Sequence, residues 1–430
     1  MFVRRAGLGS LPFGSVAAPR TVSPMIPLEE ARRHVLDRVK PLTPVRVPTS
    51  AAGGCVLAEP VVAVEAVPPF ANSAMDGYAV RASDTAGAPV ELPVVGVLAA
   101  GADPASTRVE AGQAVRIMTG AAMPDGADAI VIVEQTEPLA DGTRVRIDAT
   151  VGPGDHVRVV GDDINEGDVV FRSGERLSAA HLGVLASIGV VEVTVVPRAR
   201  VGILSTGDEL VEGDAPLRPA QIRESNRHTL LPMLEAAGCE AVDLGLVRDD
   251  RGLITDAIER AVESCDALLT SGGVSMGDFD EVKAVLSERA DDMRWMQIAI
   301  RPAKPFAFGT MGGTPVFGLP GNPVSSVISF ELLARPALRK MMGFADGDLD
   351  RPRLIATASD ALRRHPDGKV HFARVVISVE DGRLQARSAG GQGSHHLAAL
   401  AAANALAVLP DGDGVIAGDD VEVIPLAWPA

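Results

Sequence analysis

Aromatic residues and cysteines are scarce in this sequence. Its 430 residues include one tyrosine, two tryptophans and eleven phenylalanines, so aliphatic side chains must build most of the hydrophobic cores. The three cysteines, Cys55, Cys239 and Cys265, are odd in number and far apart. That pattern fits neither a disulfide framework nor a cysteine-rich metal site, and it favours buried, reduced thiols.

Positive charge is also in short supply. The chain has 40 basic against 56 acidic residues, a formal net charge of −16, and no long basic run. We therefore expect no nucleic-acid partner, because binding a phosphate backbone needs a basic surface. No stretch reaches the roughly 18 apolar residues of a membrane span, and residues 1–23 lack the apolar centre of an export signal. We expect a cytoplasmic protein with a loose tail at residues 1–23 and no membrane partner.

The hydrophobic pattern changes along the chain, which indicates several domains. Apolar residues with helical spacing follow Pro27 and end before Pro41. Short valine-rich segments separated by Gly, Pro and Asp then continue to about Arg200, and this pattern is typical of irregular β-structure. One helical stretch, residues 178–188, interrupts it.

Beyond Pro197, short apolar segments alternate with helical patterns. The predicted strands are residues 200–204, 241–247, 267–270 and 315–318, and the predicted helices are residues 228–237, 253–263, 282–289 and 324–342, the last one interrupted or kinked at Pro336. This order predicts right-handed crossovers and a parallel sheet with helices on both faces. After Gly343 the chain returns to short β-like segments.

Polar or Gly/Pro-rich segments follow four of the predicted strands. They are residues 205–209, 248–250, 271–280 and 319–323. Ligands of an open parallel sheet bind beyond the carboxyl ends of its strands, so we expect these segments to share one edge. Singly, each has a simpler explanation, such as a tight turn at the Gly-Gly pair or a helix N-cap at Asp249-Asp250. Their occurrence at four strand ends favours a binding site.

The residue types at this edge suggest phosphate chemistry. The sequence Ser-Gly-Gly, with Ser275 behind it, offers backbone N–H groups suited to a phosphate. Glu209, Asp249 and Asp280 are hard oxygen ligands of the kind that Mg²⁺ takes together with substrate phosphates. Arg301 and Lys304 can face a second anion. Together these groups suggest a reaction at a phosphate ester or anhydride.

Other common catalytic motifs are absent from the sequence. No Walker lysine, no Gly-x-Gly-x-x-Gly between the first strand and helix of the α/β region, and no His-Glu-x-x-His occurs. The eight histidines form no cluster with metal-ligand spacing. We interpret the pair His395-His396 as surface or loop residues.

Six segments resemble, in order, the signatures of the molybdopterin molybdotransferase family, which includes the C-terminal catalytic domain of gephyrin. The segments are residues 72–80 (NSAMDGYAV), 116–124 (RIMTGAAMP), 205–210 (STGDEL), 271–275 (SGGVS), 305–309 (PFAFG) and 319–325 (LPGNPVS). The resemblance implies an enzyme that inserts molybdate into adenylylated molybdopterin, hydrolyses the adenylate and releases AMP. It implies Mg²⁺ or Zn²⁺ as the divalent ion.

The resemblance also implies a multidomain α/β plus β fold. Its parts would be a central parallel α/β sheet domain that binds molybdopterin, an extended discontinuous domain, an inserted β-rich domain and a C-terminal β-barrel. Mapped onto this chain, they are residues 24–62 with 162–198 (discontinuous), 63–161 (inserted), 199–345 (α/β) and 346–430 (barrel). The implied assembly is a homodimer, in which the inserted domain of one subunit reaches the cleft of the other.

Site residues follow from the motifs and the resemblance. The predicted catalytic residues are Asp76, Thr119, Glu209, Asp249 and Asp280, of which Glu209, Asp249 and Asp280 would hold the metal. The predicted substrate-binding residues are Thr206, Ser271, Gly272, Gly273, Ser275, Arg301, Lys304, Pro320, Pro323, Ser325, Arg374 and Ser394. The implied partners are a molybdopterin adenylyltransferase and the apo-molybdoenzymes that receive the cofactor.

Two positions depart from the family pattern. Many relatives carry lysine where this chain has Gln297 and Arg301. Arg301 keeps the charge but binds an oxyanion as a planar fork rather than as a point charge, whereas Gln297 loses the charge. The choice between molybdate and tungstate stays open on this evidence.

Two other functions stay open as alternatives. A molybdopterin adenylyltransferase shares the α/β fold, but those relatives tend to be short single domains with a Gly-Gly-Thr-Gly loop, unlike the Ser-Gly-Gly-Val-Ser sequence and extra domains of this chain. A non-catalytic molybdopterin carrier or scaffold is the second alternative. The carboxylates retained at motif positions favour catalysis over it.

Overall fold

The computed structural model describes residues 24–274 and 280–427, and the chain forms two compact units. The first comprises residues up to Val39, Ala199–Leu338 and Gly347–Ala430, and the second comprises Lys40–Arg198 and Arg339–Asp346. The four-domain division expected from the sequence stays a prediction. Among the described residues, no helix is both long and apolar enough to cross a membrane.

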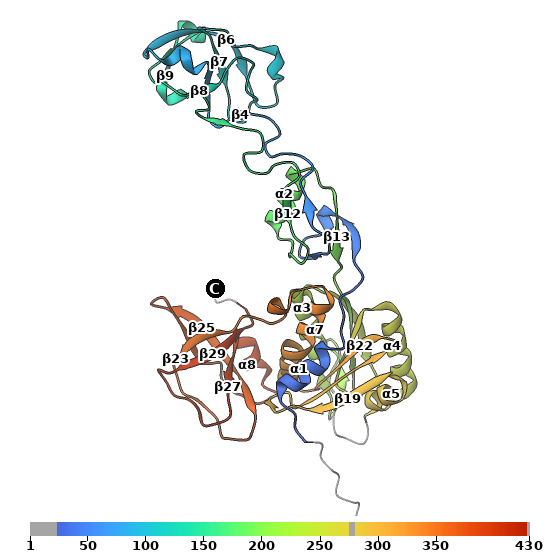
Figure 1. The fold of residues 1–430 in the computed structure, drawn as a ribbon. Coiled ribbons are helices and arrows are strands. Elements are labelled where there is room, and N and C mark those ends of the chain that lie inside the picture. The colour runs from blue at the N-terminus through green and yellow to red at the C-terminus, as the bar shows by residue number, and fades with distance from the viewer. Residues whose placement is uncertain (1–23, 275–279, 428–430) are drawn as a thin grey trace, which may run out of the picture. The chain divides into compact units, whose positions relative to one another are not determined.

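A six-stranded sheet forms the centre of the α/β part of the first unit (Figure 1), with strand order β17-β14-β18-β22-β21-β19. Its elements and the associated helices are α1 (Leu28–Leu36), β14 (Arg200–Thr206), α3 (Asn226–Ala237), β17 (Glu240–Val247), α4 (Arg251–Ser264), β18 (Ala267–Ser271), α5 (Glu281–Arg289), β19 (Asp292–Gln297), β21 (Pro305–Met311), β22 (Thr314–Leu319), α6 (Pro323–Ser329) and α7 (Arg335–Met341). A small parallel pair, β15 (Leu210–Val211) and β16 (Ile222–Arg223), precedes α3.

The sheet is mixed, whereas the sequence predicted a parallel one. β17, β14, β18 and β22 are parallel as expected. β21 and β19 are antiparallel and extend one edge. The hairpin between β21 and β22 turns at two glycines, Gly312 and Gly313, with positive φ, so that β21 returns beside β22.

Helices cover both faces of this sheet, as predicted (Figure 1). On one face, α4 and α5 bury Ile254, Ile258 and Val285 against Leu204 and Leu268 of the sheet. On the other face, α3 packs against β14 and β17. Burial of aliphatic side chains on both faces explains why the central strands are near-continuous apolar runs.

The last long helix of this region is irregular, as predicted, but the irregularity precedes Pro336. A π-helical turn, Phe330–Ala334, separates α6 from α7. Because proline has no N–H, the preceding turn lacks one regular hydrogen bond, and an inserted π turn is one way for a helix to accommodate this. Glu331 in this turn is buried and forms a bidentate ion pair with Arg351.

A closed five-stranded β-barrel completes the first unit and confirms the predicted fold of this region. The pairings β25–β26–β23–β29–β27–β25 close the ring around buried aliphatic side chains. The elements are β23 (Leu354–Ala358), β24 (Leu362–Arg363), β25 (Val370–Glu380), β26 (Arg383–Ser388), α8 (Leu397–Ala402), β27 (Ala405–Leu409), β28 (Gly414–Val415) and β29 (Asp420–Pro425). A short strand, β20 (Ile300–Arg301), pairs with the start of β25 and thereby joins the barrel to the α/β part.

The second unit is β-rich, as its sequence predicted. Its elements are β1 (Val45–Pro48), β2 (Val56–Leu57), β3 (Val61–Val62), β4 (Asn72–Ser73), β5 (Gly77–Val80), β6 (Val90–Leu98), β7 (Ala114–Ile117), β8 (Ala129–Ile132), β9 (Thr136–Leu139), β10 (Arg144–Ile147), β11 (Val157–Arg158), β12 (Val169–Phe171), α2 (Ala179–Ser187) and β13 (Glu192–Val196). One hydrophobic core lies around Leu57, Leu185 and Val195, and residues 78–157 supply two others.

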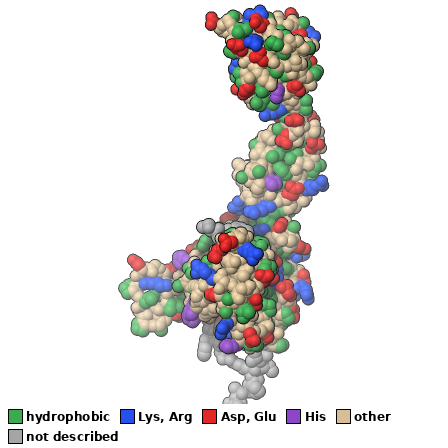
Figure 2. Space-filling view, turned by 90° about the vertical axis from the view of Figure 1, so that its left-hand side faces the viewer, with side chains coloured by type: hydrophobic (Ala, Val, Ile, Leu, Met, Phe, Trp, Pro, Cys, Tyr) green, Lys and Arg blue, Asp and Glu red, His purple; other side chains and the backbone are tan. Residues whose placement is uncertain are grey.

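The cysteines and the surface charges follow the composition. Cys55, Cys239 and Cys265 are buried free thiols, as predicted. On the face of the molecule shown in Figure 2, basic side chains are interspersed with acidic ones.

Candidate functional site

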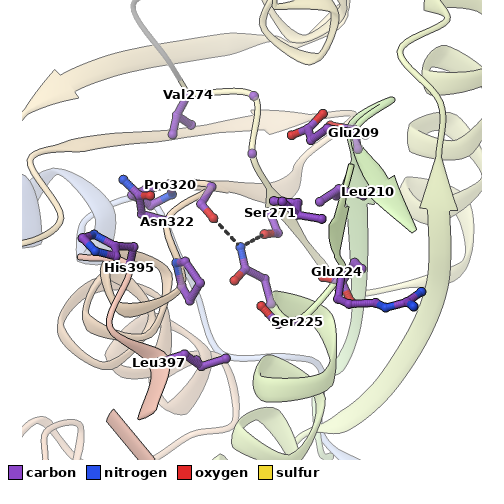
Figure 3. A pocket seen from close by; sticks show the side chains of 18 of the residues that line it. Glu209, Leu210, Glu224, Ser225, Ser271, Val274, Pro320, Asn322, His395 and Leu397 are labelled. Atoms are coloured by element: carbon purple, nitrogen blue, oxygen red, sulfur yellow. Dashed lines mark hydrogen bonds between the residues drawn. The ribbon is translucent and has the colours of Figure 1, made fainter. Parts of the chain in front are cut away.

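A cavity of about 680 Å³ lies beyond the carboxyl ends of the central strands (Figure 3). It is lined by Thr206 at the end of β14, by Ser271 at the end of β18 with Gly272 behind it, and by Pro320 after β22. Three of the four predicted strand-end segments therefore meet at one edge, as the parallel strand order requires. The barrel contributes His395 and Leu397 to the wall.

The fourth strand-end segment lies next to this wall. Asp249, which follows β17, accepts a hydrogen bond from the N–H of Asp208 at 3.2 Å, and the N–H of Asp249 reaches the carboxylate of Asp208 at 3.4 Å. The neighbouring Asp250 is the N-cap of α4, because its carboxylate accepts from the N–H of Leu253. The N-cap interpretation therefore holds for Asp250.

An asparagine that the sequence analysis missed connects two of the strand ends. Asn226, the first residue of α3, donates from Nδ2 to Ser271 Oγ and to the carbonyl of Gly321, both at 2.8 Å, as the dashed lines in Figure 3 show. Its side-chain oxygen is buried and has no hydrogen-bond partner among the described residues. Asn226 thus fixes the segment after β18 relative to the segment after β22.

A buried carboxylate also lines the cavity. The side chain of Glu224 is 1% exposed, and its Oε1 accepts from Ser205 Oγ at 3.1 Å and from the N–H of Arg227 at 2.8 Å. Arg227 is itself buried and forms ion pairs with Asp243 and Glu212. Burial of a carboxylate is costly unless donors and cations compensate for it, as these contacts do. Glu224 is therefore a fixed part of the buried side of the cavity wall, which we call the cavity floor.

The Ser-Gly-Gly sequence lies at the cavity, but one of its backbone N–H groups already donates a hydrogen bond within the protein. The N–H of Gly272 donates to the carbonyl of Leu319 at 3.0 Å. Gly273 has φ +78°, and a Cβ there would lie 2.5 Å from the Cβ of Val282, so only glycine fits. Ser275 lies outside the described residues.

The predicted metal ligands are not grouped. Glu209 is exposed on the cavity wall, whereas the Asp280 carboxylate caps α5 by accepting from the N–H of Lys283 at 3.1 Å. Within residues 24–274 and 280–427, no set of three or more His, Cys, Asp or Glu side chains could hold a metal ion. A divalent cation at Glu209 would need further ligands from the substrate, and phosphate oxygens are ligands that Mg²⁺ commonly takes. Glu209 therefore fits a Mg²⁺ site only if the substrate supplies the other ligands.

A second cavity of about 420 Å³ adjoins the first and shares Pro305 and His395 with it. Four predicted binding residues line it, and they are Arg301, Lys304, Ser325 and Ser394. The N–H of Val324, at the start of α6, donates to the carbonyl of Ser394 at 3.1 Å, which joins the barrel loop to the α/β part. The cation-lined wall is suited to an oxyanion.

Not every predicted binding residue lies on a cavity wall. Arg374 is fully buried, and its guanidinium donates to the carbonyls of Gly391 and Gly393 at 2.7 and 3.1 Å. Burial lowers the pKa of Arg374. Arg374 therefore supports the loop that carries Ser394. Gln297, in β19, is also buried and lines none of these cavities.

Asp76 and Thr119 lie together in the second unit. Asp76 Oδ1 accepts from the N–H of Thr119 at 2.7 Å and from its hydroxyl at 2.8 Å. These two hydrogen bonds, the backbone one first, lower the pKa of Asp76. Asp76 is therefore an ionised, exposed carboxylate held in one orientation. That these residues reach the cleft of another subunit stays a prediction.

His395 was interpreted from the sequence as a surface or loop residue. It is exposed, and its ring lies on the side of the first cavity where Asn322 also lies, with Glu209 and Leu210 on the other side (Figure 3). It also lines the second cavity.

Comparisons with known proteins give one consistent result. Family models match residues 26–189 (MoeA N-terminal region, domain I and II), 202–340 (probable molybdopterin binding domain) and 356–426 (MoeA C-terminal region, domain IV). The chain is 38% identical to a molybdopterin molybdenumtransferase of Haemophilus influenzae (93% of this chain, 98% of that one) and 39% identical to molybdopterin molybdenumtransferase 2 of Mycobacterium tuberculosis (92% and 98%). The crystal structure of a molybdopterin biosynthesis MoeA protein from Pyrococcus horikoshii matches with a TM-score of 0.76 and 30% identity, covering 94% of this chain and 100% of that one.

Proposed function

Because the chain belongs to the molybdopterin molybdenumtransferase family, we propose that it transfers molybdenum from molybdate to molybdopterin in molybdenum-cofactor biosynthesis. We further propose that it acts on adenylylated molybdopterin and releases AMP. One observation carries the proposal: a cavity with carboxylates, beyond the ends of the parallel strands, adjoins a cavity lined by cations. Such a pair can hold a phosphate-linked substrate next to an oxyanion.

The larger cavity is the proposed site of adenylylated molybdopterin. Its volume of about 680 Å³ falls within the range of small-molecule sites, about 300–1,000 Å³. Gly273 lets the backbone approach a phosphate without a side chain in between, and Asn226 keeps the two loops at a fixed separation. Glu209 would hold Mg²⁺ together with substrate phosphate oxygens, and the bound ion would offset negative charge on the departing phosphate.

The smaller cavity is the proposed site of molybdate. The guanidinium of Arg301 and the ammonium of Lys304 supply two positive charges for a dianion, and Ser325 and Ser394 supply hydroxyl donors. The planar guanidinium of Arg301 can donate parallel N–H groups to two oxygens of a tetrahedral anion. Pro305 and His395, on the wall of both cavities, mark where the two substrates would meet.

The proposed reaction breaks the phosphoanhydride bond between AMP and molybdopterin phosphate. An oxygen of water or molybdate attacks phosphorus, and the electron pair of the broken bond stays with the leaving phosphate. The two dithiolene thiols of molybdopterin then bind molybdenum through sulfur, and one oxygen of molybdate leaves as water with their two protons. The residues of this chain bind and orient the two anions, so its contribution is proximity and charge neutralisation.

We also propose a homodimer that acts in the cytoplasm. Val62 of β3 and Val169 of β12 are cross-strand partners in the second unit and are 45% and 53% exposed. We place this pair in the proposed subunit contact because burying it against a partner would remove its apolar surface from water. Light scattering of the full chain and of Val62→Lys tests this: a dimeric wild type and a monomeric variant support it, and a monomeric wild type contradicts it.

The experiment that tests the function measures AMP release from adenylylated molybdopterin with Mg²⁺, with and without molybdate. We expect molybdate-stimulated release in the wild type and its loss in Glu209→Ala. Glu263→Ala, an exposed change at the end of α4, is the matched control and should behave as wild type. Unchanged turnover in Glu209→Ala and Asp249→Ala would refute the role of these carboxylates.

The same assay separates the alternatives. ATP-dependent adenylylation of molybdopterin by this chain would favour the adenylyltransferase. Tight binding of the adenylylated compound without AMP release would favour a carrier or scaffold. A coupled assay with an adenylyltransferase and an apo-molybdoenzyme would test the proposed partners.

A further inference from the structure

A third cavity, of about 340 Å³, lies where β20 meets the barrel. Its wall carries five arginine or histidine side chains, and they are Arg301, Arg363, Arg364, His365 and His371. The described residues that line it include no Asp or Glu. It shares Arg301, Pro302, Gln392 and Gly393 with the second cavity, so the two are neighbours.

One of these arginines already has its charge matched within the protein. The side chain of Arg364 is 1% exposed, and its guanidinium donates to Asp367 at 2.9 Å and to Asp411 at 2.7 Å. It also donates to the carbonyls of Lys369, Leu409 and Pro410. Arg364 is therefore a fixed part of the wall rather than a mobile ligand group.

The other two arginines are not matched in this way. The side chain of Arg301 is 64% exposed, and its nearest carboxylate, that of Asp367, is 3.8 Å away and already accepts hydrogen bonds from Arg364 and Lys369. Arg363 is exposed and forms no ion pair or side-chain hydrogen bond with any residue in the described part of the chain. Two guanidinium groups without dedicated carboxylates therefore face one small cavity.

We propose that this third cavity binds a small tetrahedral dianion, the chemical class of molybdate, tungstate, sulfate and hydrogen phosphate. Two guanidinium groups match the charge of a dianion and can each donate two N–H groups to its oxygens. Its volume is at the small end of ligand sites, about 300–1,000 Å³, which suits a hydrated oxyanion.

The position of Arg301 gives this site a role in the reaction. Because Arg301 lines both the second and the third cavity, an anion held by Arg363 and Arg301 can pass to Lys304 without leaving Arg301. The third cavity is therefore a holding site from which molybdate enters the second cavity. This role rests on the proposed function, whereas the binding of a dianion does not.

The binding test uses the full chain and inorganic molybdate alone, without pterin, in equilibrium dialysis at low salt. We expect two molybdate ions per wild-type chain. Arg363→Ala should weaken one of them about tenfold or more, since a charge-assisted contact is lost. Lys304→Ala should weaken the other. Arg383→Ala is the matched control and should bind as wild type. Arg383 begins β26 and pairs with Glu380, which lies about 30 Å along β25 from His371.

A second readout tests the holding role. In Arg363→Ala, the molybdate concentration for half-maximal AMP release should rise, while the rate at saturating molybdate stays unchanged. Tungstate should displace molybdate from the Arg363-dependent site more effectively than phosphate does. More effective displacement by phosphate would make it a phosphate site and overturn the holding role.

The outcomes separate this proposal from the proposed function. Wild-type molybdate stoichiometry and affinity in Arg363→Ala would overturn the third site even if the enzyme releases AMP normally. Conversely, Arg363-dependent binding in a chain that releases no AMP would support the site and contradict the proposed function. Thermal unfolding of each variant excludes misfolding as the cause.

Discussion

Asn226 offers the sharpest test of how the larger cavity is built. Replacing it by aspartate keeps the shape of the side chain but removes the Nδ2 donor that bonds Ser271 Oγ and the Gly321 carbonyl, both at 2.8 Å. The Ser271 hydroxyl can donate to the new carboxylate instead. The Gly321 carbonyl cannot, because it is an acceptor facing another acceptor.

The expected cost follows from that one unmatched carbonyl. Gly321 is exposed, so water can reach its carbonyl, and the expected cost is that of one ordinary hydrogen bond, about 0.5–1.5 kcal/mol. If the separation of the two loops decides how well the substrate fits, the same free energy appears in binding. Since about 1.4 kcal/mol is a tenfold change, we expect kcat/KM for AMP release to fall about 2- to 12-fold.

Steady-state AMP release measures this effect, and Asn404→Asp is its matched control. Asn404 donates in the same way to the carbonyl of Ile377 at 2.9 Å, but it lies in the barrel and lines none of the three cavities. Both variants should lower the thermal unfolding temperature, and only Asn226→Asp should lower kcat/KM. Equal kcat/KM for folded Asn226→Asp and wild type would refute the positioning role.

Three further changes follow from the described contacts. Glu331→Gln breaks the buried bidentate pair with Arg351, whose N–O distances are 2.7 and 2.9 Å, and should cost about 3–5 kcal/mol in thermal or chemical unfolding. Burial alone would raise the pKa of Asp367, but hydrogen bonds from Lys369 and His371 lower it from 3.8 to about 2. The carboxylate therefore stabilises the fold above pH 3.8, and this stabilisation is lost as the pH falls to about 2. Asp367→Asn should therefore lose less stability than wild type over that pH window. Thr119→Val removes the hydroxyl donor to Asp76 and should raise the Asp76 pKa toward its usual value, as an NMR titration of the carboxyl carbon would show.

The α/β core could be predicted because its elements are dictated locally. Strands β14, β17 and β18 are short apolar runs, and the helices between them have regular apolar spacing and clear ends, such as Gly238 in the left-handed conformation after α3. β19 and β21 were missed for a different reason. The sequence of β19 mixes charged and apolar residues because only part of it is buried, and β21 begins at a proline, which is typical of a turn.

The site could be predicted only where it depends on strand ends. Thr206, Ser271 and Pro320 lie at the carboxyl ends of parallel strands, so topology alone brings them together. Glu224 and Asn226 belong to a short segment before α3, where such residues are typical of a helix start, and nothing local shows that they line the cavity floor. The role of Asn226 depends on contacts with residues 45 and 95 positions away, Ser271 and Gly321.

Arg374 shows that a site residue predicted from the family resemblance need not lie on a cavity wall. Arg374 lies on β25 with its side chain fully buried, and it donates to the carbonyls of Gly391 and Gly393, while its own backbone exchanges two hydrogen bonds with the side chain of Gln392. Residues 392–395 of this loop line the second cavity, and two of them also line the third. Only Nη2 donates to the loop, and the buried Nε and Nη1 have no hydrogen-bond partner among the described residues. Burial of a guanidinium without a carboxylate is costly, so its two hydrogen bonds to the loop carbonyls are the contacts that offset this cost. Arg374 thereby supports this loop from behind. Since one nitrogen makes both bonds, an ammonium with three donors could replace it only where the shorter lysine side chain reaches the same point.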